Sequence, residues 1–183
     1  TTGKSIIKGF GLGLIGVFLL LCFLFKSYIE PIIVMSIIPL GLIGVIWGHL
    51  LMGLDLSMPS IIGYASLAGV VVNDSILLVH FIKIRRAEGK SSVDAAQTAS
   101  RERFRAVLLT SLTTIAGLLP LMLEQSLQAQ ILIPLVTSLS FGLLASTGLV
   151  LIVVPVLYAI FDDFGWTVDI NEGNSEVIVG QAV

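Results

Sequence analysis

The sequence predicts an all-α integral membrane protein with five transmembrane helices and one short cytoplasmic amphipathic helix. Of its 183 residues, 56% are hydrophobic and only 12% are charged, whereas soluble domains usually carry about 25% charged residues. Five apolar runs are long enough to cross a hydrocarbon core about 30 Å thick. The net charge of −2, without a basic stripe that includes aromatic residues, gives no indication of nucleic-acid binding.

The predicted spans alternate with short polar connections and cover residues 10–25, 32–52, 60–83, 106–123 and 131–161. We therefore expect a transmembrane bundle over residues 1–161, followed by a mobile acidic cytoplasmic tail over residues 162–183. Because the chain begins Thr-Thr-Gly rather than with methionine, we also expect it to be a piece of a longer protein.

Small residues mark contact surfaces on the first two predicted spans. The first span carries several closely spaced glycines, which leave a smooth surface for close packing of another helix. The second begins at Pro31, whose missing N–H is not needed in a first helical turn, and contains the contact motif Gly44-x-x-x-Gly48. His49 comes near the end of this span, so we expect it at the membrane interface and not as a ligand.

The third predicted span places Asn73 and Asp74 side by side near the middle of an apolar stretch. As a helix, residues 60–83 extend about 36 Å at 1.5 Å per residue, which is enough to cross the membrane. A carboxylate at that depth costs about 2.5–3.5 kcal/mol on insertion scales, so it must face protein or water and be paired or protonated. The other acidic residues lie in connections, at span ends or in the tail. We therefore predict that Asp74 handles protons.

The segment between the third and fourth spans is polar and predicts a helix of its own. Ser91-x-x-Asp94 resembles a capping box, with aspartate in place of the usual Glu or Gln. Residues 93–104 are predicted to form an amphipathic helix that lies on the membrane surface and runs into the fourth span. The fifth run is longer than a span needs, and we expect Pro134 and Pro155 to break off its ends.

The basic residues predict the orientation of the chain. Seven of the ten Lys and Arg residues lie between Lys83 and Arg105, and Lys26 falls on the same side of an alternating path. The positive-inside rule places that side in the cytoplasm, so the N-terminus is predicted to be periplasmic and the C-terminus cytoplasmic. A basic connection is also typical of lipid headgroup binding, and that alternative stays open.

Asp74 needs neighbours that respond to its charge, and the sequence offers several polar candidates. Asn73 can donate and accept a hydrogen bond and so can orient the carboxyl group. Thr110 and Thr114 stand four residues apart on the fourth span, where they either bond back to their own helix or bond across to Asp74. His80 is a weaker candidate, because it lies about 120° around the helix from Asp74.

Several segments of the chain have a familiar combination of residues, namely FKSYIEPI from residue 25, PLGLIG from residue 39, GVVVNDSILLV from residue 69, RERFRAVLLTSL from residue 101 and PVLY from residue 155. Together they resemble the second half of a resistance–nodulation–division (RND) transporter, in the hydrophobe/amphiphile multidrug efflux branch. The resemblance covers nearly all of residues 1–161. It implies spans eight to twelve of a twelve-span transporter of the bacterial inner membrane.

The family resemblance also implies a site. The tenth span of such transporters usually carries an adjacent Lys-Asn pair, and the matching residues here are Asn73 and Asp74, so the lysine is missing. The relay threonine matches Thr110 and the relay arginine matches Arg103, which would otherwise be a lipid anchor. The resemblance therefore implies a proton relay of Asp74, Asn73, Thr110 and Arg103, with His80 and Thr114 as weaker members.

From these features we expect a secondary transporter rather than an enzyme, which exports hydrophobic or amphiphilic compounds in exchange for protons. The resemblance implies a homotrimer in contact with membrane lipid, a periplasmic adaptor and an outer-membrane channel, without a cofactor or a resident metal. Two alternatives remain. One is an RND member with another cargo, a metal ion or a lipid, and the other is a non-transporting scaffold or assembly module in which one fixed bond satisfies Asp74.

Overall fold

The structure is a computed structural model that describes residues 2–26 and 29–164, and within them all regular structure is helical. The helices are α1 (Thr2–Phe25), α2 (Ile29–Met52), α3 (Met58–Ala87), α4 (Ser92–Met122) and α5 (Leu127–Asp163). Each helix is long and apolar enough to cross a membrane. The prediction of an all-α, multi-pass membrane protein is therefore confirmed.

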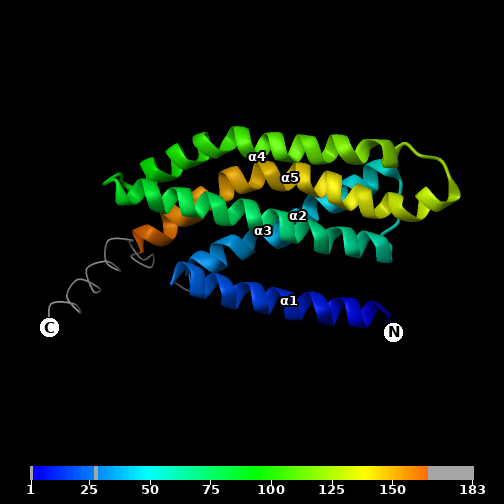
Figure 1. Cartoon of the computed structure of the whole chain (residues 1–183), viewed down its shortest axis with the longest axis horizontal. Coiled ribbons are helices and arrows are strands. Elements are labelled where there is room, and N and C mark those ends of the chain that lie inside the picture. Colours follow the sequence, from blue (N-terminus) through cyan, green and yellow to red (C-terminus); the bar gives the residue numbers. More distant parts are fainter. Residues whose placement is uncertain (1, 27–28, 165–183) are drawn as a thin grey trace.

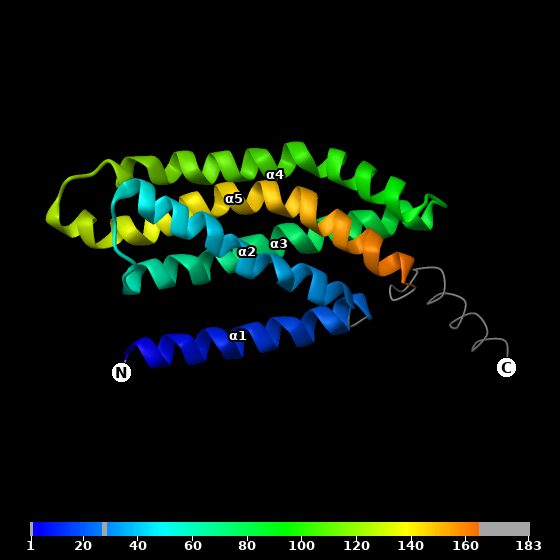
Figure 2. The same ribbon diagram turned by 180° about the vertical axis from the view of Figure 1, so that it is seen from behind.

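The helices run in alternating directions, and α5 lies at the centre of the bundle (Figure 1, Figure 2). α5 packs against α2, α3 and α4, whereas α1 lies at the edge and contacts α2 and α3. α1 begins at one end of the bundle and α5 ends at the other, as an odd number of successive spans requires (Figure 1).

Serine caps explain where the last two helices begin. The backbone N–H of Asp94 donates to Ser91 Oγ at 3.3 Å, so the predicted helix start at Ser91 is confirmed. The N–H of Ala129 donates to Ser126 Oγ at 3.3 Å at the start of α5. Each serine satisfies one of the N–H groups that a first helical turn leaves without a partner.

The structure corrects two details of the predicted elements. Residues 93–104 are helical, but they continue without a break into the fourth span and form the first part of α4 rather than a separate short helix. Pro134 and Pro155 lie inside α5 and do not break off its ends. Ser100 Oγ donates to the carbonyl of Leu151 at 3.3 Å, which is the carbonyl that Pro155 leaves without a helical donor.

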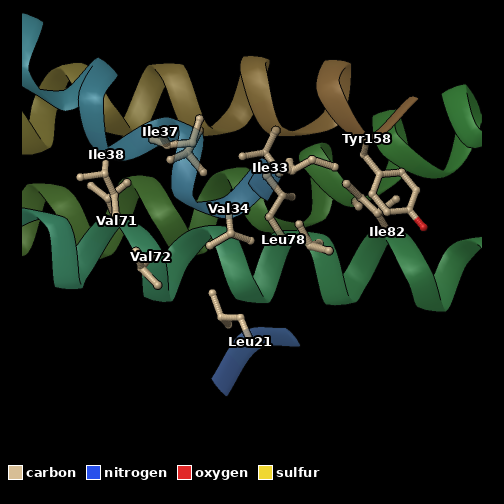
Figure 3. Close-up of a cluster of buried hydrophobic side chains, with 14 of the residues drawn as sticks. Leu21, Ile33, Val34, Ile37, Ile38, Val71, Val72, Leu78, Ile82 and Tyr158 are labelled. Carbon is tan, nitrogen blue, oxygen red and sulfur yellow. The ribbon is translucent and has the colours of Figure 1, made fainter. Parts of the chain in front are cut away.

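The core lies between α2, α3 and α5 (Figure 3). Branched aliphatic side chains of α2 and α3 meet there, with one aromatic ring from α5. The fully buried members include Ile33, Val34, Ile37, Leu78, Ile82 and Tyr158. This close packing fixes the position of α3, the helix that carries Asp74.

The predicted contact motif of α2 is confirmed. A Cβ atom added to Gly44 would lie 2.6 Å from the carbonyl oxygen of Phe141, and one added to Gly48 would lie 2.6 Å from Cγ of the same residue. Only glycine at these positions allows α2 and α5 to approach so closely.

α1 is held more loosely than the other helices. Leu21 and Phe25 are buried near its end, and the Phe10 ring centroid lies 6.2 Å from that of Tyr64 on α3. Cβ atoms added to its glycines at positions 9, 11, 13 and 16 would meet no atom of the described chain within 4 Å. The close helix packing predicted for this glycine surface is therefore not made within the described residues.

Candidate proton-coupling site

Asp74 lies in the middle of α3, and its side chain is only 6% exposed. Leu67, Val71 and Leu78, which lie one or two turns away on the same helix, are also buried. In the described part of the chain, Asp74 makes no hydrogen bond and no ion pair. A buried carboxylate without a partner is costly, so this group must be protonated or must receive a partner from outside the described residues.

Arg103 of α4 is the charged residue that faces this part of α3. Its guanidinium lies 5.3 Å from the ring centroid of Phe81, which is on the same face of α3 as Asp74 and about two turns further on. The Arg103 guanidinium attracts the Asp74 carboxylate electrostatically. Its Nε atom is buried and has no hydrogen-bond partner among the described residues. Asp74 and Arg103 therefore interact electrostatically, but no hydrogen bond or ion pair connects them.

The other predicted relay residues do not contact Asp74. Asn73 and His80 are exposed on α3. Thr110 is exposed on α4 and donates to the carbonyl of Ala106 at 2.9 Å. Thr114 donates to the carbonyl of Thr110 at 2.8 Å. Both threonines therefore bond back to their own helix here, and their part in a relay stays a prediction.

Helical register nevertheless relates the threonines to Arg103. Thr110 follows Arg103 by seven residues and Thr114 follows it by eleven. At 100° per residue, these spacings place both hydroxyls within about 20° of the direction of Arg103. The three side chains therefore form one polar stripe along α4. The buried hydroxyl of Ser111 lies off this stripe, 2.5 Å from Thr147 Oγ1 of α5.

Glu30 forms a second buried charged site, which sequence reasoning missed. Its side chain is 0% exposed, although the sequence placed it in a polar turn. Lys83 Nζ lies 3.0 Å from each of its carboxylate oxygens and 5.4 Å from the ring centroid of Phe25. This ion pair joins the start of α2 to the last part of α3. The partners are 53 residues apart, so no local pattern reveals the pairing.

A third charged contact ties three helices at the same end of the bundle. Asp162 of α5 forms an ion pair with Arg86 of α3 and accepts a hydrogen bond from Ser92 of α4. Residues 162 and 163 therefore belong to α5, although the sequence placed them in the mobile tail. The tail predicted for residues 165–183 lies outside the described residues.

His49 is buried rather than interfacial, which corrects the expectation for this residue. It is 3% exposed, and its Nδ1 lies 2.9 Å from the carbonyl oxygen of Val45. Its Nε2 is hydrogen-bonded to Ser60 Oγ at 2.7 Å, which joins α2 to α3 at the end opposite Glu30. Both ring nitrogens are satisfied, so His49 has a structural role.

The chemistry available at the site is proton binding. A carboxyl group can take up or release a proton, and a nearby guanidinium favours the charged form of that carboxyl group. Among the described residues, no group of three or more His, Cys, Asp or Glu side chains is placed to hold a metal ion.

This arrangement defines a class of protein, a helical membrane bundle with a buried carboxyl group in the middle of one helix. Residues 2–162 match the AcrB/AcrD/AcrF family, and the chain belongs to that family of RND transporters.

Two crystal structures of a heavy metal efflux pump are similar to the chain. Crystal form II matches with a TM-score of 0.75 and 28% sequence identity over 84% of this chain. Crystal form I matches with a TM-score of 0.72 and 27% identity over 84% of this chain. The chain covers 15% of the length of each of those structures. These matches support the RND assignment, but they do not support the hydrophobe/amphiphile branch.

Proposed function

We propose that this chain is the proton-coupling part of an RND efflux transporter, in which Asp74 gains and loses a proton during each transport cycle. The observation that carries the proposal is a buried mid-helix carboxylate that has no fixed partner among the described residues and is attracted by Arg103. The apolar surroundings favour the neutral carboxyl group, whereas Arg103 favours the charged one. A small movement of α4 relative to α3 changes that balance.

The fixed-bond alternative, a scaffold without transport, has less support. A scaffold residue buried in the core would be satisfied by one permanent hydrogen bond or ion pair. Glu30 is such a residue, because Lys83 lies 3.0 Å from both of its oxygens. Asp74 has no comparable partner within the residues that the structure describes. The stripe of Arg103, Thr110 and Thr114 supplies the remaining members of the proposed relay, together with Asn73, the residue that precedes Asp74 in the chain.

The cargo that we propose is a heavy-metal ion rather than a hydrophobic compound. The support is the likeness to the two structures of a heavy metal efflux pump, which match at 27–28% identity over most of this chain. Export of hydrophobic or amphiphilic compounds is the second candidate, because the sequence segments resemble that branch. Growth of cells with and without the complete transporter, on heavy-metal salts and on hydrophobic dyes, separates the two cargoes.

We also propose the assembly and orientation that the family implies. The complete protein would form a trimer in the inner membrane and connect to a periplasmic adaptor and an outer-membrane channel. The basic end of the bundle, with Arg85, Arg86 and Lys83, would face the cytoplasm.

The experiment that tests the function is Asp74→Asn in the complete transporter. Export should be abolished while the amount of folded protein is unchanged, because the amide keeps the shape of the carboxyl group but binds no proton. Asp55→Asn is the matched control, since Asp55 is exposed in the connection between α2 and α3. Normal export by the Asp74 variant would rule out the proposed role.

A further inference from the structure

A groove runs along α4 and α5 and shares no residue with the Asp74 site. It consists of two adjoining hollows of about 380 and 400 Å³. Four residues line both hollows, namely Ser100, Arg101, Leu151 and Ile152. The hydrogen bond from Ser100 Oγ to the carbonyl of Leu151 connects the two helices within the groove.

The groove is open and mostly apolar. Ile152 is 65% exposed, Val156 is 51% exposed and Phe104 is 52% exposed. A Cβ atom added to Gly148 would meet no atom within 4 Å, so this glycine leaves free space in one hollow. Both helices are apolar enough to span a membrane. In a membrane, the apolar surface of the groove would therefore be in reach of lipid acyl chains.

Arg101 adds a charge to this apolar surface. It is exposed, and within the described part of the chain it has no acidic partner. Its neighbours differ, because Arg85 pairs with Glu88 and Glu102, and Arg86 pairs with Asp162. A guanidinium without an acidic partner beside an apolar groove complements one kind of molecule, an acyl chain attached to a phosphate.

We propose that this groove binds an anionic phospholipid. The phosphate lies on the Arg101 guanidinium between the two hollows, and an acyl chain lies in the hollow formed by Phe104, Gly148 and Ile152. The site lies toward the end of the bundle where most of the basic residues gather, so the headgroup and the protein surface have opposite charge.

Photo-crosslinking tests this proposal in the complete transporter, reconstituted in vesicles that contain phosphatidylglycerol with a diazirine in one acyl chain. After illumination, peptide mapping by mass spectrometry should find adducts on residues 148–156 of α5. Phosphatidylcholine with the same acyl probe is the neutral comparison and should label these residues less. If another segment of the transporter fills the groove, residues 148–156 carry no adduct, and the proposal is wrong.

Two variants separate the charge from the shape of the groove. Arg101→Gln should reduce phosphatidylglycerol labelling about fivefold, as expected for the loss of one basic contact with an anionic lipid. Gly148→Leu fills one hollow without a change of charge and should also reduce labelling. Lys90→Gln and Gly117→Leu are matched controls, because Lys90 is an exposed cation outside the groove and Gly117 is an open glycine elsewhere on α4.

Only the groove variants should lose the lipid. Equal loss in Lys90→Gln would show attraction to the whole basic surface and would overturn the proposal. Unchanged labelling in both groove variants would also overturn it. The elution volume of each purified variant on size exclusion confirms that the compared proteins are folded.

Discussion

Two carboxylates are buried in the described part of this bundle, and their surroundings differ in one respect. Glu30, at the start of α2, is 0% exposed and has Lys83 Nζ 3.0 Å from both oxygens. Asp74, in the middle of α3, is 6% exposed and has no bonded partner among the described residues. Arg103 attracts the Asp74 carboxylate electrostatically, without a hydrogen bond or an ion pair between the two side chains.

The difference separates a structural charge from a charge that can change. A buried ammonium favours the charged form of the carboxylate bonded to it, because loss of the carboxylate's charge would leave the ammonium without its counter-charge. A carboxylate attracted only from a distance is held less firmly in one state, so its protonation can follow a movement of the helices. Burial alone therefore does not identify a functional carboxylate, and it is the absence of a fixed partner among the described residues that makes Asp74 the candidate.

The largest expected effect comes from breaking the fixed pair. Lys83→Met leaves the buried Glu30 carboxylate without its bonded ammonium, and should lower the free energy of unfolding by about 3–5 kcal/mol. Thermal unfolding and steric-trapping measurements in the same detergent check this value. The exposed Lys90→Met is the matched control and should change stability by less than about 0.5 kcal/mol.

A second substitution sharpens this test. Glu30→Leu combined with Lys83→Met removes both charges, so most of the lost stability should return. If Lys83→Met alone were as stable as the wild type, the ion pair would not hold α2 to α3, and the contrast with Asp74 would disappear.

The same carboxyl-to-amide change at the two sites gives the next largest difference. Glu30→Gln leaves the Lys83 ammonium without its counter-charge and should cost about 3 kcal/mol or more. Asp74→Asn removes no bonded partner and should change stability by less than about 1 kcal/mol. Unfolding of the two variants side by side measures the contrast. A large loss of stability in Asp74→Asn would mean that a fixed partner exists outside the described residues.

The sequence was sufficient to predict the helical fold and the place of Asp74 in the middle of a long apolar helix. Both depend on the length and polarity of single apolar runs, which set where a helix crosses and which residue falls in its middle. It was not sufficient for the Glu30–Lys83 pair, since each partner lies near a span end and looks solvated by itself. The burial of Glu30 depends on how α2 meets α3, and that contact joins residues far apart in the chain.

Two hydrogen bonds to helix carbonyls explain another part of what the sequence missed. The sequence offered two interpretations for Thr110, and in the structure its hydroxyl bonds back to Ala106. Pro155 looked like a helix breaker, but Ser100 of a neighbouring helix donates to the carbonyl that the proline leaves free. Such compensation between helices has no signature in either segment alone.

The smallest expected effect on stability is that of Thr110→Val, and it tests whether the relay extends along α4. The lost hydroxyl bonds only to its own helix in the described structure, so the free energy of unfolding should change by less than about 0.5 kcal/mol. Export should nevertheless fall about fivefold, as for one lost hydrogen bond of about 1 kcal/mol, because Thr110 lies on the stripe with Arg103.

Thr113→Val is the matched control for this stripe. Thr113 is also exposed on α4, and its hydroxyl donates to the carbonyl of Leu109 at 2.7 Å. It follows Arg103 by ten residues, which places it about 80° from the direction of Arg103, whereas Thr110 lies within about 20° of that direction. The two variants should therefore be equally stable but differ in export. If both variants exported equally well, loss of the Thr110 hydroxyl would have no effect beyond that of the Thr113 hydroxyl. Proton coupling would then be confined to Asp74 and its immediate neighbours, and the relay would not extend along α4.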